Sequence, residues 1–235
     1  MKKYFFIWFC IFFAGIVIFA GCSSQSLMNE QKRIIFFGDS ITELGVKPNG
    51  YVTLLRDSLA QQNTPYEIIG AGVSGNKISD LLARVDRDVL SKNPGIVVIY
   101  IGINDVWHFA FASRGLSGTP KPVFREGLST LIETLKSQNI RVLLCTPSVI
   151  GEKTGGANTY DAMLDEYSAV SRETAEKENI PLCDLRTAFK EYLALHNTEN
   201  KEKGILTYDG VHLSDEGNRL AAQQILASLK KSIIQ

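Results

Sequence analysis

The chain has 235 residues, 21% of them charged, and its 25 basic residues balance its 25 acidic residues. This balance argues against a nucleic-acid-binding protein, which would carry a basic stripe or a basic domain. Ordinary numbers of glycine and proline, 19 and 7, exclude collagen-like and low-complexity chains. The length fits one domain that can bury a sizeable core.

The first 21 residues form a separate segment. Met1-Lys2-Lys3 is basic, and residues 4–20 carry no charged side chain. A basic start, an apolar stretch and small residues before a cleavage point are typical of an export signal. Phe19-Ala20-Gly21-Cys22 resembles the bacterial lipobox, although Phe19 stands where leucine is usual; the resemblance implies that Cys22 is lipidated and becomes the first residue after cleavage.

We therefore expect a lipoprotein signal peptide over residues 1–21, a tether over 22–32 and one folded domain over 33–235. The protein would be exported and anchored in the bacterial cell envelope through a lipid on Cys22. An uncleaved signal-anchor helix is the first alternative, because about 17 apolar residues is also the lower limit for a membrane span. A secreted product without an anchor is the second.

Two further cysteines, Cys145 and Cys183, end short apolar runs. A buried free cysteine behaves as a small apolar side chain. The sequence contains neither a CxxC pair nor a Cys/His cluster that would favour a disulfide or a metal site. We predict buried thiols.

Short runs rich in isoleucine and valine alternate with amphipathic segments from residue 33 onward, and the last helix is expected to begin at Ser214. This alternation predicts an α/β fold: a three-layer α/β/α sandwich around a central, mostly parallel five-stranded sheet. The commoner doubly wound pattern suggests the strand order 2-1-3-4-5. The predicted strands are 34–37, 66–69, 96–101, 141–145 and 180–183.

Polar clusters follow the predicted strands. Ligands of open α/β sheets bind beyond the carboxyl ends of the strands, so these clusters are expected to share one site. They are Gly38-Asp39-Ser40, the glycine-rich residues 70–76, Gly102-Ile103-Asn104-Asp105 with an aromatic loop over 107–122, the stretch 150–160, and Asp209-Gly210-Val211-His212.

These clusters contain the parts of a serine esterase. Ser40 could act as a nucleophile, and His212 is the best candidate base among the three histidines. Asp209 lies three residues before His212, close enough to fix its tautomer. Candidate donors to an oxyanion are the backbone N–H of Ser40, the N–H of Gly75 and the side-chain amide of Asn104.

The blocks Gly38-Asp39-Ser40, Gly75, Gly102-x-Asn104-Asp105 and Asp209-x-x-His212 together resemble the SGNH (GDSL) hydrolase family, in the family's order. The resemblance implies a flavodoxin-like fold and a catalytic triad of Ser40, His212 and Asp209. It also implies an oxyanion hole formed by Ser40, Gly75 and Asn104, with Gly72 as a rival for the glycine position. The family uses no metal or other cofactor and hydrolyses esters of lipids, acetylated sugars and other small alcohols.

Each residue also has a plainer interpretation. Ser40 could cap a helix, and Asn104 could be a turn residue. Asp39 and Asp105 are expected to hold their loops through backbone N–H groups, and Asp184 to cap a helix. His108 and His196 lack metal-ligand spacing. The aromatic residues Trp107, Phe109 and Phe111 could line an acyl or sugar pocket or simply pack together.

Other classes of protein fit less well. Ser74-Gly75-Asn76-Lys77 and Lys153-Thr154-Gly155 match pieces of a penicillin-binding or β-lactamase site, but no Ser-Asp-Asn lies between them. The sequence contains neither a GxSxG elbow nor a Walker A loop. We predict an esterase that acts on acetyl or other short acyl groups of sugars or lipids. A lysophospholipase-like acyl hydrolase and a non-catalytic glycan-binding lipoprotein are the alternatives.

Overall fold

The computed structural model describes residues 33–61 and 66–234. The predicted signal peptide (1–21), the lipidation site Cys22 and the tether (22–32) lie outside the described residues. Within the described ranges, no helix combines the length and the apolarity that crossing a bilayer requires.

Five strands form one parallel sheet in the order β2-β1-β3-β4-β5, which confirms the predicted fold class and strand order. Every residue of β3 is buried, as expected for a central strand whose two faces are both covered. The strands are β1 (Arg33–Gly38), β2 (Glu67–Gly72), β3 (Ile96–Tyr100), β4 (Arg141–Cys145) and β5 (Leu182–Cys183).

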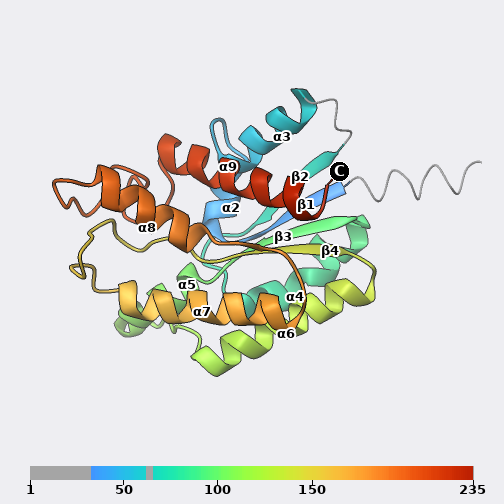
Figure 1. The fold of residues 1–235 in the computed structure, drawn as a ribbon. Helices are drawn as coiled ribbons and strands as arrows, with labels where there is room; N and C mark the ends of the chain where they lie inside the picture. Colours follow the sequence, from blue (N-terminus) through green and yellow to red (C-terminus); the bar gives the residue numbers. More distant parts are fainter. Residues whose placement is uncertain (1–32, 62–65, 235) are drawn as a thin grey trace, which may run out of the picture.

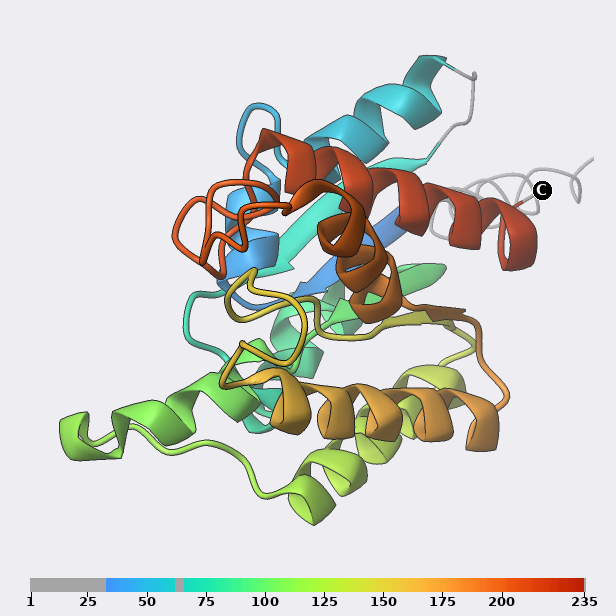
Figure 2. The same ribbon diagram turned by 60° about the vertical axis from the view of Figure 1, so that its left-hand side comes forward.

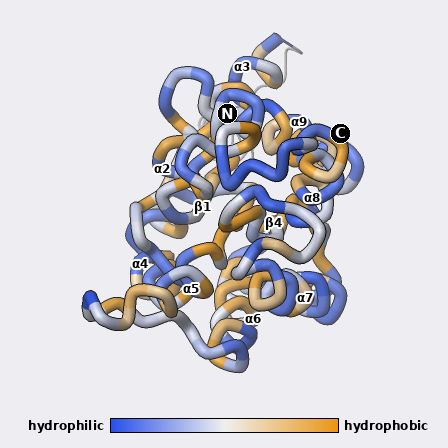
Figure 3. Tube along the Cα trace, turned by 90° about the vertical axis from the view of Figure 1, so that its left-hand side faces the viewer, coloured by the Kyte–Doolittle hydropathy of each residue, from blue (hydrophilic) through white to orange (hydrophobic). Residues whose placement is uncertain are grey.

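Helices cover both faces of the sheet (Figure 1). On one face lie α3 (Tyr51–Gln61), α8 (Leu185–His196) and α9 (Asp215–Ser232). On the other lie α4 (Ile78–Asp88), α6 (Lys121–Ser137) and α7 (Asp161–Lys177). Figure 3 shows both hydrophobic and hydrophilic residues along α6 and α7, because only the inner side of each helix reaches the core. Shorter elements are α2 (Ser40–Gly45), η1 (Leu90–Lys92), α5 (Ile103–Trp107) and η2 (His108–Arg114).

Two strands differ from their predicted ranges by more than one residue at an end, whereas β1, β3 and β4 agree within one residue. β2 runs on to Gly72 because its glycine-rich end pairs with the end of β1, and a Cβ on Gly72 would lie 2.1 Å from the backbone nitrogen of Glu43 in α2. β5 is reduced to Leu182–Cys183. Pro181, just before it, has no N–H to donate to the ladder, although its carbonyl still accepts from Leu144 at 3.1 Å.

The predicted cysteine and cap roles are confirmed. Cys145 and Cys183 are free thiols buried side by side on β4 and β5. The side chain of Asp184 accepts from Thr187 N at 3.2 Å at the start of α8, and that of Ser214 accepts from Gly217 N at 3.2 Å at the start of α9.

The carboxyl ends of the strands lie at the left of Figure 1 and face the viewer in Figure 3. The segments after β1, β2, β3 and β4 all emerge there, together with the connection between α8 and α9. The fold therefore brings the predicted polar clusters to one edge of the sheet.

Candidate active site

A line of hydrogen bonds joins three polar side chains at this edge. Ser40 is the second residue after β1 and the first residue of α2, and only 8% of its surface is exposed. Its Oγ lies 2.9 Å from Nε2 of His212, whose Nδ1 lies 2.6 Å from Oδ2 of Asp209. A carboxylate can only accept, so Nδ1 carries the proton and Nε2 is left to accept from the Ser40 hydroxyl. Three residues that are up to 172 positions apart in the sequence thus meet in one place.

The turn that carries His212 is held by Asp209. Oδ1 of Asp209 accepts from the backbone nitrogens of Val211 and His212 at 2.9 and 2.8 Å, which leaves Oδ2 for the imidazole. Partial burial alone would raise the pKa of Asp209, but the hydrogen bonds from His212 and Val211 outweigh it and hold that pKa below its ordinary value. The ring of Tyr208 stacks on the imidazole with centroids 5.7 Å apart. The imidazole is therefore fixed in orientation with an ionised carboxylate behind it.

Two buried carboxyl groups support the loops around Ser40, as the sequence predicted. Oδ1 of Asp39 accepts from Ile41 N at 2.9 Å and caps α2, and Oδ1 of Asp105 accepts from Ile78 N at 3.2 Å. Burial raises the pKa of Asp39 to about 7 and that of Asp105 to about 6. Asp39 caps its own helix, and Asp105 connects α5 to the start of α4. Neither of these hydrogen bonds involves Ser40.

Of the residues predicted as oxyanion donors, Ser40 follows β1, and Gly75 and Asn104 lie in the segments after β2 and β3. Gly75 occupies a turn with φ of +78°, a conformation that favours glycine, and nothing lies within 4 Å of the position of a Cβ. Gly72, its rival, lies inside β2 and is packed under α2. Asn104 is buried in α5, and its Nδ2 donates to the backbone oxygen of Asn76 at 3.0 Å. The amide of Asn104 is thereby tied to the residue that follows Gly75.

Arg84 organises the same region, and the sequence analysis missed it. Its guanidinium donates to Gly38 O at 2.7 Å, to Ala71 O at 3.0 Å and to Oδ1 of Asn76 at 2.7 Å. It is only 7% exposed and lies 4.4 Å above the ring of Phe37. One side chain on α4 therefore connects the ends of β1 and β2 with the turn that contains Gly75.

The residues that resemble a β-lactamase site have other partners. Both the backbone nitrogen and the hydroxyl of Ser74 donate to Glu43 at 2.6 Å. The Nζ of Lys77 donates to Ser117 O at 2.8 Å, and that of Lys153 pairs with Glu202 at 2.8 Å. The hydroxyl of Ser74 is bonded to Glu43, and both lysines have partners other than Ser74. These residues therefore do not form a second nucleophilic site.

The aromatic loop after Asn104 is more ordered than expected. It forms the end of α5 and then η2, an arm that projects from the body in Figure 2. The rings of Trp107 and Phe111 meet edge to face at 5.2 Å, and Phe109 covers Gly118, where an added Cβ would lie 2.3 Å from the ring. Mutual packing thus accounts for most of this cluster, while Phe109 remains 41% exposed.

The remaining histidines stand apart from His212. His108 is buried, whereas the exposed ring of His196 stacks on Tyr192 at 4.0 Å. In the described part of the chain, no group of three or more His, Cys, Asp or Glu side chains gathers in a way that could hold a metal ion.

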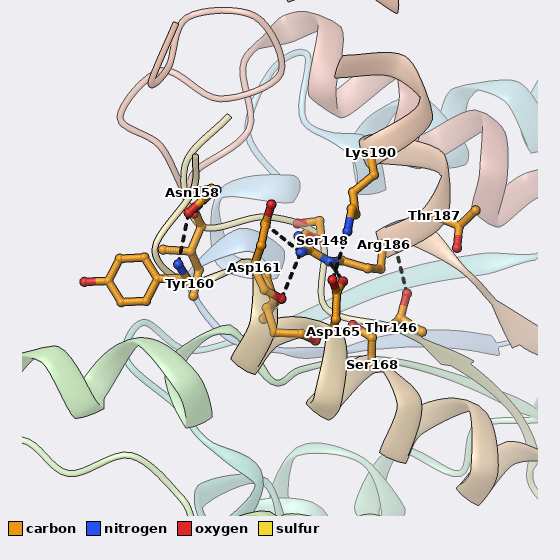
Figure 4. A network of polar contacts seen from close by, with 12 residues as sticks. Thr146, Ser148, Asn158, Tyr160, Asp161, Asp165, Ser168, Arg186, Thr187 and Lys190 are labelled. Atoms are coloured by element: carbon orange, nitrogen blue, oxygen red, sulfur yellow. Dashed lines mark hydrogen bonds and ion pairs between the residues drawn. The ribbon is translucent and has the colours of Figure 1, made fainter. Parts of the chain in front are cut away.

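A second polar network follows β4 (Figure 4), and no pattern in the sequence predicts it. Arg186, 1% exposed, pairs with Asp161 at 2.6 Å and with Asp165 at 2.8 Å and donates to Ser148 O at 3.0 Å. Its own backbone nitrogen donates to Thr146 Oγ1 at 2.8 Å. This network connects the segment after β4 to α7 and α8, and it supports one wall of the edge that carries the site.

Comparison with known proteins identifies the family and relatives of the same fold. The sequence model of the GDSL-like lipase/acylhydrolase family matches residues 36–220. The crystal structure of an acetyl xylan esterase, AlAXEase, is 47% identical and has a TM-score of 0.80, over 84% of this chain and 99% of that chain. An acetylxylan esterase of Geobacillus stearothermophilus is 28% identical over 84% of this chain and 94% of its own length. An uncharacterized lipoprotein, YqeF, of Bacillus subtilis is 25% identical over 92% and 96%.

A parallel α/β/α sandwich with a Ser-His-Asp arrangement at its carboxyl edge, and with esterases as its relatives, defines a carboxylic ester hydrolase. The chain belongs to the GDSL-like lipase/acylhydrolase family, as its sequence blocks suggested.

Proposed function

We propose that this protein is a serine esterase that removes acetyl or other short acyl groups from sugars. The observation that carries the proposal is the continuous line from Asp209 through His212 to Ser40, with heavy-atom distances of 2.6 and 2.9 Å. Nucleophile, base and orienting carboxylate lie within the hydrogen-bond reach that acyl transfer by a serine requires.

The reaction has two halves. Nε2 of His212 takes the proton of the Ser40 hydroxyl while Oγ attacks the ester carbonyl carbon, and Asp209 stabilises the imidazolium. The tetrahedral intermediate collapses, the bond to the alcohol breaks, and the alcohol leaves with the proton from His212. Water then attacks the acyl-serine with His212 again as base, which frees the acid and restores Ser40.

The oxyanion of each tetrahedral intermediate would accept from the N–H groups of Ser40 and Gly75 and from the amide of Asn104. Asn104 is suited to this role because its Nδ2 has two hydrogens and the bond to Asn76 O uses one of them. That bond fixes the plane of the amide, so the second hydrogen has a set direction before substrate arrives. Pre-oriented donors stabilise developing charge without reorganisation during the reaction.

A sugar acetyl ester is the favoured substrate because relatives that match nearly their whole length are named as acetylxylan esterases. The test uses p-nitrophenyl esters from acetyl to palmitoyl and an acetylated xylan, with Ser40→Ala as control. We expect turnover that is highest on acetyl, release of acetate from the xylan, and loss of both in Ser40→Ala. A palmitoyl optimum would instead identify a lipid acyl hydrolase, and glycan binding without turnover would identify a binding protein.

We also propose that the protein is exported and anchored through a lipid on Cys22, with residues 1–21 removed, 22–32 as tether and 33–235 as the hydrolase domain. The support is the sequence Phe19-Ala20-Gly21-Cys22 and the similarity to a protein named as a lipoprotein. Labelling of cells with a fatty-acid probe should mark the full chain but not Cys22→Ser. Equal labelling of both proteins would contradict the anchor.

A further inference from the structure

Glu152 is a fully buried carboxylate in the segment after β4, outside every hydrolase motif of the sequence. Its Oε1 accepts from the backbone nitrogen of Leu206 at 2.8 Å and from both N and Oγ1 of Thr207 at 2.5 and 2.6 Å. Its Oε2 accepts from Ile205 N at 2.9 Å. Three consecutive backbone N–H groups and a hydroxyl therefore converge on one side chain.

A carboxylate is the side chain best suited to such a set of donors. Buried backbone N–H groups require partners, and three successive groups that point to one place cannot all pair within a strand. A carboxylate accepts at both oxygens and forms charge-assisted hydrogen bonds, which are shorter and stronger than neutral ones. Glu152 thus fixes residues 205–207 as a unit against the segment after β4.

Residues 205–207 begin the narrow loop that carries the proposed base, His212, and its orienting carboxylate, Asp209. Thr207 forms an antiparallel bridge with Leu213, and Tyr208 N donates to His212 O at 3.0 Å. At the tip, Gly151 N donates to Gly210 O at 2.7 Å. The loop is therefore held at its base by the side chain of Glu152 and at its tip by the backbone of Gly151, the residue before Glu152.

We propose that Glu152 is a positioning residue for catalysis, whose buried carboxylate sets the place of the Asp209–His212 pair relative to Ser40. The proposal rests on the serine-esterase function argued above. None of these bonds involves Ser40 or His212, so Glu152 acts through the backbone of residues 205–207 and the hydroxyl of Thr207.

Glu152→Gln tests the proposal with little change in shape. An amide has only one oxygen, so its NH2 group must face either Ile205 N–H or the three donors at Oε1, and the loop must shift. Because a misplacement of about 1 Å can cost about 10²-fold in rate, we expect kcat for p-nitrophenyl acetate to fall by about 10- to 100-fold with KM nearly unchanged. The far-downfield proton NMR signal of the His212 Nδ1–H should shift or broaden, because its bond to Asp209 is disturbed.

Asp184→Asn is the matched control. Asp184 also accepts from a backbone nitrogen and a hydroxyl, those of Thr187 at 3.2 and 2.8 Å, and it caps α8. It pairs with Arg172 at 2.9 Å and accepts from Thr146 Oγ1 at 3.1 Å, and none of these partners lies in residues 205–213. We expect this variant to lose thermal stability and to keep kcat and the downfield signal. Both variants are assayed well below their unfolding temperatures, with circular dichroism to verify the fold.

The outcomes separate the two proposals. If Ser40→Ala retains full turnover, the serine-esterase function fails, whatever Glu152 does. If turnover depends on Ser40 but folded Glu152→Gln keeps the kcat and the downfield signal of the parent, the positioning role is overturned. Should Glu152→Gln not fold, Thr207→Val removes only the hydroxyl donor at 2.6 Å. We expect a several-fold smaller kcat in that variant, and a kcat equal to the parent's would overturn the proposal.

Discussion

Substitution of the buried cap residue by its amide, Asp39→Asn, should make the protein more stable than its parent at alkaline pH. Asparagine keeps the oxygen that accepts from Ile41 N, so the cap of α2 is preserved. What the substitution removes is the cost of burying an ionised carboxylate, the main reason why the pKa of Asp39 is raised to about 7.

The sign and size of the effect follow from proton linkage. Because the folded pKa of Asp39 is raised above its unfolded value, the protonated form favours the native state, and that contribution is lost as pH rises from about 4 through about 7. A rise of about three pKa units corresponds to about 4 kcal/mol over the whole window. Between pH 5 and pH 8 the expected loss is about 2.5 kcal/mol, because part of the titration lies below pH 5.

The assay is urea unfolding of the parent and Asp39→Asn at pH 5 and pH 8. The quantity to compare is the difference in the free energy of unfolding between the two proteins at each pH. Effects of acids far from Asp39 are common to both proteins and cancel. The repulsion between Asp39 and Asp105, which helps to raise the pKa of Asp39, is present only in the parent and adds to the effect in the same direction. The reasoning predicts that the stability of Asp39→Asn relative to the parent increases by about 2.5 kcal/mol from pH 5 to pH 8. A difference that is the same at both pH values would refute it.

Three further substitutions test the site and its support. Asn104→Ala should lower kcat for p-nitrophenyl acetate by about 10²–10³-fold, the usual cost of one oxyanion donor, and unchanged kcat would remove Asn104 from the mechanism. Asp209→Asn should lower kcat by about 10⁴-fold, as for the corresponding change in a serine protease, while thermal unfolding stays close to that of the parent. Arg84→Met removes this donor from Ala71 O and Gly38 O, of which Gly38 O keeps its bond from Val73 N at 3.2 Å. Urea unfolding should therefore show a loss of about 1–3 kcal/mol; equal stability would contradict the support role.

The sequence was sufficient to predict the sheet and the candidate site residues that lie in turns directly after strands. Short apolar runs locate β1, β3 and β4 because a central parallel strand must be apolar on both faces. Ser40, Asn104 and the Asp209–His212 turn follow buried runs or precede a capped helix, so the topology alone predicts that they share an edge. The end of β2 was missed because its glycines look like a loop until their pairing with β1 is known.

The buried charged side chains that support the site could not be predicted in the same way. Arg84, Glu152 and Arg186 lie in polar stretches and have the residue types that are usually exposed. Their partners lie tens of residues away, 46 positions for the bond from Arg84 to Gly38 and 55 for that between Glu152 and Thr207. A local sequence pattern cannot predict contacts between residues so far apart in the chain. The burial of these side chains is therefore seen only in the folded structure.

The most direct test of the central claim is to trap the nucleophile with an organophosphate ester, diethyl p-nitrophenyl phosphate. The proposed mechanism predicts that attack by Ser40 releases one p-nitrophenolate per chain, abolishes esterase activity and leaves a diethylphosphoryl group on Ser40, to be located by peptide mass spectrometry. Asp209→Asn should react far more slowly, and Ser40→Ala not at all. A phosphoryl group on another residue, or ester turnover that continues in Ser40→Ala, would contradict the account.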